Sequence, residues 1–185
     1  MNLEKVFYYI FSLYIIVYIG YSFYINLLHI SYSIISLLAI LLPLIILFII
    51  QWILWKYTDV RNKKKVKTRF ITISILSFIP VIYCVVILGV NEYKSNFTTE
   101  RWLNNPGERV YLIDDLLNEY KLIDKTKTEV HTLLGSPTET EYFKDENNIV
   151  YHLGNERGLI SIDSEWLIIW FNDNEKVTKY EIVTD

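Results

Sequence analysis

Two histidines and one pair of carboxylates are the residues of this sequence whose types could carry out chemistry. His131 and His152 could transfer a proton or bind a metal ion. Asp163 and Glu165, two residues apart in an extended segment, could share a cation. Neither histidine has a sequence neighbour that would complete a triad or a set of metal ligands. We therefore favour structural roles for these groups, and expect no catalytic residue, no metal and no cofactor.

Two further features could be mistaken for reactive sites. The segment Gly154-Asn155-Glu156-Arg157-Gly158 is flanked by glycines but opens no helix, so we interpret it as a turn and not as a phosphate loop. Cys84 is the only cysteine and lies inside an apolar run. It can form no internal disulfide, and we expect it to pack as a small apolar side chain. The elements that carry these residues are more informative than the residues themselves.

Three long apolar runs account for most of the first half of the chain. Residues 6–28, 30–55 and 70–91 contain no Lys, Arg, Asp or Glu. Each run is long enough to cross a bilayer core as a helix, which takes about 20 residues. We therefore predict a membrane region of three transmembrane helices over residues 1–91. The absence of ionisable residues from the runs argues against an ion or proton pathway.

Charge between the runs predicts the orientation of the helices. The link between the second and third runs is basic, with Lys56, Arg61, Lys63, Lys64, Lys65, Lys67 and Arg69. The link between the first and second runs has no basic residue except His29. Because short basic loops stay in the cytoplasm, we predict a multi-pass protein of the cytoplasmic (plasma) membrane. Its N-terminus would be cytoplasmic and its residues 92–185 extracytoplasmic.

The two halves of the chain also differ in net charge. Residues 1–90 carry eight Lys and Arg against two Asp and Glu, whereas the remainder carries ten against nineteen. An acidic domain is repelled by the phosphates of nucleic acids, so we expect no nucleic-acid partner. The partners we expect are the lipid bilayer and another extracytoplasmic or membrane protein.

Two start signals predict helices in the water-exposed part. We expect residues 92–107 to be a connector, with a short helix near Thr99–Leu103. The sequence Asn105-Pro106-Gly107-Glu108 then has the form of a capping box with Pro at the first helical position. Thr126-Lys127-Thr128-Glu129 is a second capping box, and its helix should end at Gly135.

The remaining segments alternate like strands. We predict strands at Thr138–Phe143, Ile149–Leu153, Glu165–Phe171 and Val177–Val183. The predicted fold class is therefore a membrane α-helical region joined to a small α+β domain at residues 108–185. In that domain, two helices would pack on a three- or four-stranded antiparallel sheet.

The second helix and its surroundings are similar to a known domain. Thr126-Lys127-Thr128-Glu129-Val130, followed by Leu133-Leu134-Gly135-Ser136-Pro137 and a sheet, resemble the SmpA/OmlA/BamE-like domain over about residues 108–184. Beta-lactamase inhibitor proteins share this unit of two helices and a sheet. The resemblance implies a bacterial domain that binds other proteins and is not an enzyme. The chain departs from the family at Asp124, where Gly is frequent, and in having three helices instead of an N-terminal lipidated cysteine.

The strongest strand offers a candidate interaction face. Alternation places Trp166, Ile168 and Trp170 on one side of the strand, opposite Leu167, Ile169 and Phe171. Two helices can cover only one side of a sheet, so the other would carry aromatic side chains suited to protein binding. Alternatively, the connector, with Phe97 and Trp102, could fold over that side.

These observations predict a non-enzymatic integral membrane protein that displays a protein-interaction domain of BamE-like type. The alternative is a membrane sensor or immunity-type protein that binds its ligand through the transmembrane helices.

The orientation can be tested by cysteine labelling. Cysteines at Asn62 and at Asn147, each in a Cys84→Ser background, should behave oppositely toward a membrane-impermeant thiol reagent on intact cells. Because the basic loop is predicted to be cytoplasmic, only position 147 should react. Labelling at position 62 and not at 147 would reverse the predicted topology.

Overall fold

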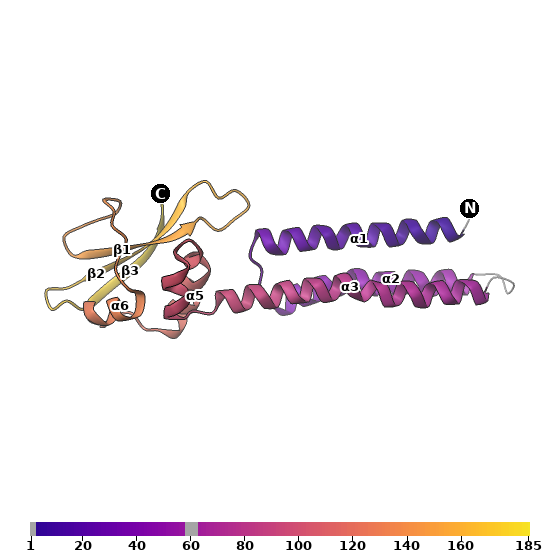
Figure 1. Cartoon of the computed structure of the whole chain (residues 1–185), viewed down its shortest axis with the longest axis horizontal. Coiled ribbons are helices and arrows are strands. Elements are labelled where there is room, and N and C mark those ends of the chain that lie inside the picture. Colours follow the sequence, from indigo (N-terminus) through magenta and orange to yellow (C-terminus); the bar gives the residue numbers. More distant parts are fainter. Residues whose placement is uncertain (1–2, 58–62) are drawn as a thin grey trace. The chain divides into compact units, whose positions relative to one another are not determined.

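The structure, a computed structural model, describes residues 3–57 and 63–185 (Figure 1). The chain divides into two compact units, Met1–Glu92 and Tyr93–Asp185. We refer to them as the membrane unit and the soluble unit, because the first contains the apolar runs and the second the charged part of the sequence.

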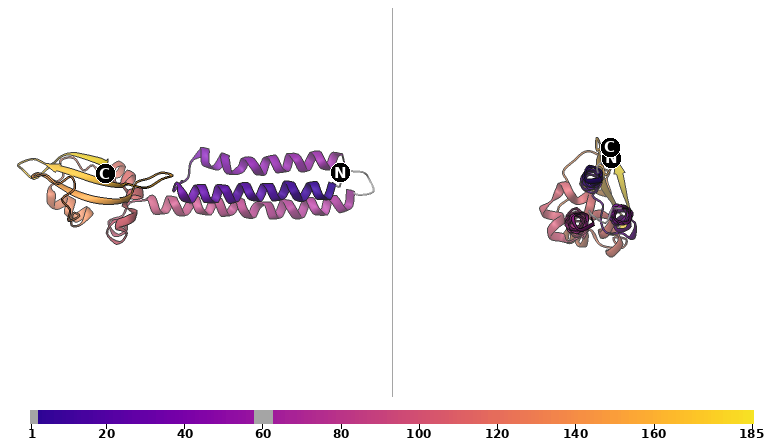
Figure 2. Two further views of the ribbon diagram at one scale, coloured as in Figure 1. Left: turned by 90° about the horizontal axis from the view of Figure 1, so that it is seen from above. Right: turned by 90° about the vertical axis from the view of Figure 1, so that its right-hand side faces the viewer.

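The membrane unit confirms the three predicted helices, α1 (Leu3–Leu27), α2 (Ile34–Lys56) and α3 (Lys63–Ser95). Each contains a stretch long and apolar enough to cross a membrane, which suggests a membrane protein. An end-on view places the three helices at the corners of a triangle (Figure 2). Helix α2 starts four residues after the beginning of the second apolar run at residue 30. The helix begins after Ser33, whose hydroxyl accepts a hydrogen bond from Ser36 N and forms a capping box.

Two buried tyrosines join the three helices. The Tyr14 hydroxyl donates to the carbonyl oxygen of Ser77 at 2.6 Å, and the Tyr18 hydroxyl donates to the carbonyl oxygen of Ile40. These carbonyls lie three residues before Pro80 and Pro43. Each proline provides no backbone N–H to its helix. The tyrosine side of α1 therefore packs on both neighbours, and its phenols are satisfied without water.

A buried asparagine ties α3 to the link between α1 and α2. Asn91 Nδ2 donates to the carbonyl oxygens of Ile25 at 3.2 Å and Ile30 at 2.9 Å. Deeper in the unit, Ser74 donates to Gln51 Oε1 at 2.9 Å. In a bilayer, such polar bonds would hold the helices together, because lipid offers polar side chains no alternative partner.

The soluble unit is a three-stranded antiparallel sheet in the order β1-β2-β3, with helices on one face (Figure 1). Its elements after α3 are α4 (Thr99–Asn104), the 3-10 turn η2 (Pro106–Glu108), α5 (Arg109–Glu119), α6 (Lys127–Leu134), β1 (Asn148–Asn155), β2 (Ser164–Phe171) and β3 (Val177–Thr184). The last three predicted strands and the predicted fold class of this unit are confirmed.

One predicted strand and one predicted cap are wrong. Residues 138–143 form no strand. Thr138 N donates to Val150 O at 2.8 Å, and Thr138 Oγ1 accepts from His152 N at 2.9 Å, but no regular ladder with β1 follows. Phe143 has a positive φ of 57°, which no strand residue adopts. Asn105 makes no side-chain cap bond, because the chain turns through η2 before α5 begins at Arg109.

The second predicted capping box is confirmed. Thr126 Oγ1 accepts from Glu129 N at 3.2 Å, and Glu129 Oε2 accepts from Thr126 N at 2.7 Å. The backbone hydrogen bond from Thr126, and then that from its hydroxyl, lower the pKa of the Glu129 carboxyl. Helix α6 ends at Gly135, whose φ of +74° disfavours any residue with a side chain.

The core of the soluble unit is centred on Trp102, from the segment expected to be a connector. Its ring is fully buried, and its Nε1 donates to Leu134 O at 3.0 Å. Arg109 is also buried, with Nε donating to Trp102 O at 2.9 Å and its guanidinium 5.0 Å from the Trp102 ring centre. Tyr151 packs edge-on to the same ring and donates to Gly135 O at 2.9 Å. The tryptophan thus joins α4, α5, α6 and β1.

We expect residues 92–185 to unfold cooperatively without the membrane helices, because the soluble unit has its own core. Trp102→Ala should lower its free energy of unfolding by about 3–5 kcal/mol, since it leaves a large cavity. Asn104→Ala, an exposed change in the same helix, should cost about 0.5 kcal/mol or less. Urea unfolding followed by tryptophan fluorescence and circular dichroism measures both. A parent domain that binds hydrophobic dye and melts without cooperativity would contradict an independent core.

Candidate functional site

The candidate site is the face of the sheet opposite the helices, which we call the outer face. Leu167, Ile169 and Phe171 point into the helix-covered core. Trp166 and Ile168 point away from it and form a second, small cluster with Val150. Strand alternation therefore divides β2 as the sequence predicted, and no helix of the soluble unit belongs to that second cluster.

An irregular segment covers one end of the outer face. Tyr142 stacks on Trp166 with ring centres 5.9 Å apart, and Phe143 lies 6.2 Å from the same ring. Trp166 is consequently only 8% exposed, and its buried Nε1 has no hydrogen-bond partner among the described residues. The alternative in which the connector covers this face is wrong, because Phe97 and Trp102 lie in the main core on the other side.

The other end of the outer face is more open. Trp170 is partly buried, and Lys179 on β3 holds its ammonium 4.7 Å from the ring centre. Lys179 also donates to Glu181 at 2.8 Å. The exposed aromatic surface thus consists of Tyr142, Phe143 and the partly covered Trp170. A charged pair of opposite sign lies beside Trp170. Aromatic side chains with adjacent charges are the composition that binding surfaces favour.

The two histidines lie apart. His131 Nδ1 is 3.3 Å from Gly135 O at the end of α6. His152 lies on β1, with its ring 4.7 Å from Trp166 at the outer face. Within residues 3–57 and 63–185, no three His, Cys, Asp or Glu side chains are placed to share a metal ion. Cys84 is buried in the membrane unit.

One member of the carboxylate pair is bound by Arg157, which the sequence did not single out. Glu165 is buried and accepts from Arg157 Nε at 3.1 Å and Nη2 at 3.0 Å, whereas Asp163 is exposed. Arg157 Nη1 also donates to Asp114 at 2.7 Å. Burial alone would lower the pKa of Arg157, but the hydrogen bonds and charge of Glu165, with Asp114, raise it. The Glu165 carboxylate therefore already has a cationic partner in Arg157.

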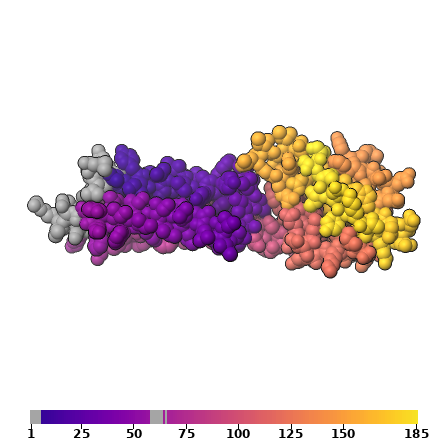
Figure 3. Space-filling model, turned by 180° about the vertical axis from the view of Figure 1, so that it is seen from behind, coloured from indigo at the N-terminus to yellow at the C-terminus, as the bar shows by residue number. Residues whose placement is uncertain are grey.

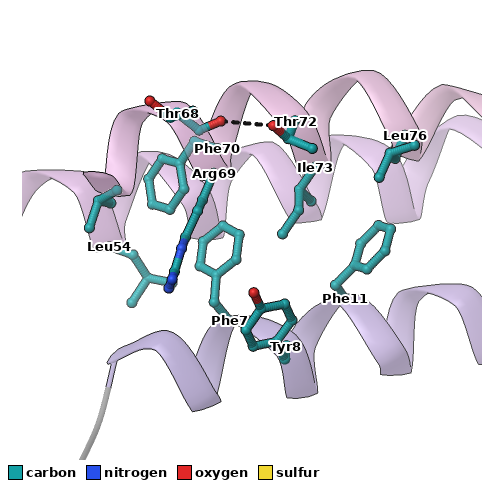
Figure 4. A pocket seen from close by; sticks show the side chains of 11 residues that line it. Phe7, Tyr8, Phe11, Leu54, Thr68, Arg69, Phe70, Thr72, Ile73 and Leu76 are labelled. Atoms are coloured by element: carbon teal, nitrogen blue, oxygen red, sulfur yellow. Dashed lines mark hydrogen bonds between the residues drawn. The ribbon is translucent and has the colours of Figure 1, made fainter. Parts of the chain in front are cut away.

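A cavity of about 250 Å³ opens between helices of the membrane unit (Figure 4). Phe7 and Phe11 of α1 face Ile73 of α3 across it, and Phe70 stacks on Phe7 with ring centres 4.5 Å apart. The side chain of Arg69 extends from α3 toward α1 in Figure 4. The walls of the cavity are mostly apolar, which suits an acyl chain.

Arg69 is one of the basic residues predicted to orient the helices. Lys56 ends α2, and Lys64 and Lys67 lie in the first turns of α3, where they are exposed. Arg61, and the side chains of Lys63 and Lys65, lie outside the described residues. Within the described part, the predicted basic link is thus largely the start of α3. The cavity itself had no signal in the sequence, because a gap between helices depends on how they pack.

Comparison with protein-family models, with characterised proteins and with solved structures finds no match for this chain.

Strand alternation predicts two classes of variant in residues 92–185. Leu167→Ala removes a fully buried core side chain and should cost about 2–5 kcal/mol of unfolding free energy. Trp170→Ala, on the open end of the outer face, should cost about 1 kcal/mol or less. Thermal melts of the two variants decide between the classes. Equal destabilisation would mean that both faces act as core.

Proposed function

We propose that this chain is a non-enzymatic integral membrane protein that presents its soluble unit outside the cytoplasmic membrane to bind another protein. The observation that carries the proposal is the outer face, where Tyr142 and Trp170 remain accessible beside Lys179 and Glu181. Binding energy in protein interfaces concentrates on a few aromatic and charged residues of this kind. The basic link supports the proposed orientation, and the resemblance to the BamE-like domain agrees with the proposed role.

A second candidate function follows from the cavity in the membrane unit. Its apolar walls favour an acyl chain as ligand, which would make the protein a membrane sensor or an immunity-type protein. In this case the soluble unit would report the binding event instead of recruiting a partner.

Site-specific photo-crosslinking separates the two functions. A benzophenone amino acid at Lys179, on the outer face, should give a discrete protein adduct in cells that express the full chain. The same amino acid at Asn118, exposed on α5, serves as the matched control and should give none. Trp170→Ala should abolish the Lys179 adduct, because it removes the aromatic anchor without unfolding the domain.

Equal adducts from both positions, or none from Lys179, would refute the interaction role. The second function is favoured if the full-length protein retains an amphiphile in native mass spectrometry while residues 92–185 retain none.

A further inference from the structure

The loop between β1 and β2, residues 156–163, carries the most exposed aliphatic side chains of the soluble unit. Leu159, Ile160 and Ile162 are 65%, 74% and 82% exposed. They fall within four consecutive residues at the end of a loop that projects from the sheet (Figure 3). Scattered apolar side chains on a surface are ordinary, but a cluster of this kind marks a contact with protein or lipid.

The stem of the loop is held by specific bonds. Glu156 N donates to Asp163 O at 2.8 Å and closes the stem. Arg157 binds Glu165 through both of its carboxylate oxygens and reaches Asp114 on α5. The apolar tip is therefore presented from a fixed base, which lowers the entropy lost when it binds a surface.

The stem lies at the end of the soluble unit where the membrane helix enters. The last turn of α3 belongs to this unit, and there Lys94 pairs with Glu108 at 3.6 Å. The neighbouring Gly107 packs so tightly on the end of β1 that a Cβ on Gly154 would lie 2.3 Å from its carbonyl oxygen. Gly154 closely precedes the loop. The entry of α3 and the loop stem are thus joined through Glu108 and Gly107.

No linker separates that end of the unit from the apolar helix. Helix α3 is continuous to Ser95, and its apolar run ends near residue 91. At 1.5 Å per residue, the four or five intervening residues span roughly 8 Å. The soluble unit therefore begins within a few residues of the apolar run of α3.

We propose that the tip Leu159–Ile162 inserts into the interface of the lipid bilayer that anchors the chain. Its three aliphatic side chains leave water, while the carboxylates of Glu156 and Asp163 remain in the polar head-group region. The flanking carboxylates offer no attraction to anionic lipids, so zwitterionic lipid suffices. The contact is a second membrane attachment that orients the soluble unit. It does not depend on the proposed protein-binding role, because it uses a different surface.

Fluorescence quenching of the full-length protein in phosphatidylcholine nanodiscs tests the proposal. Ser161→Cys, in a Cys84→Ser background, places an environment-sensitive dye at the tip while keeping all three apolar side chains. Asp173→Cys is the matched control, because it lies in the turn at the far end of β2, about 25 Å along the strand. Lipids with a spin label high on the acyl chain should quench position 161 and not 173. Aqueous iodide should quench position 173 and not 161.

A second variant shows whether the apolar side chains cause the insertion. Adding Ile160→Asp and Ile162→Asp to the labelled protein should abolish lipid quenching and restore iodide quenching, with the melting temperature unchanged because both residues are exposed. Iodide quenching of position 161 equal to that of 173 would overturn the proposal. Protection from both quenchers would also overturn it, since it would place the tip against protein. Neither result bears on the Lys179 crosslink, so the two proposals fail separately.

Discussion

The soluble unit depends on the burial of one tryptophan in a position that several elements share. The indole of Trp102 donates a hydrogen bond to Leu134 O in α6, and its ring packs on Tyr151 of β1. Its own carbonyl accepts from Arg109, which also donates to His152 O at 3.3 Å. Burial lowers the pKa of Arg109, so carbonyl oxygens and the indole face must stabilise its charge in place of water. Removing the ring would leave a cavity and would take away the indole face that lies beside the Arg109 guanidinium.

The membrane unit meets the same requirement between its three apolar helices. A polar group between apolar helices has no water to bond, so each must find a partner inside the protein. Tyr14 and Tyr18 donate to carbonyls near prolines, and Asn91 donates to two carbonyls at the α1–α2 link. The tyrosines fix α1 to both other helices, and Asn91 of α3 binds the last turn of α1 and the link that follows it. A helix that provides only apolar contacts would have little preference for one register over another.

The two proposed contact surfaces of the soluble unit are built differently. On the outer face, the segment at 138–143 lies over Trp166 and leaves its indole nitrogen buried without a partner among the described residues. A buried donor without a partner costs free energy, so the segment that covers Trp166 adds less to the stability of the domain than a fully hydrogen-bonded cover would. In the stem of the β1–β2 loop, Arg157 donates hydrogen bonds to the Glu165 carboxylate. The tip of this loop is apolar and exposed. The first surface suits a partner that completes it, and the second suits a fluid, nonspecific phase such as lipid.

The sequence alone determined the features that depend on neighbouring residues. Uninterrupted apolar runs predicted three helices, the pattern Thr126 to Glu129 predicted a capped helix, and alternation divided β2 into two faces. These signals are local, because a helix cap or a strand face involves residues a few positions apart. The strand predicted at Thr138–Phe143 failed because strand pairing is not local: one backbone bond, from Thr138 N to Val150 O, joins the segment to β1, and Phe143 has a positive φ. Tertiary structure alone decided three features. Trp102 and Arg109 belong to the core, Arg157 binds Glu165, and Tyr142 covers Trp166. Each of these outcomes is set by contacts between residues distant in the sequence, whose energies no local pattern encodes.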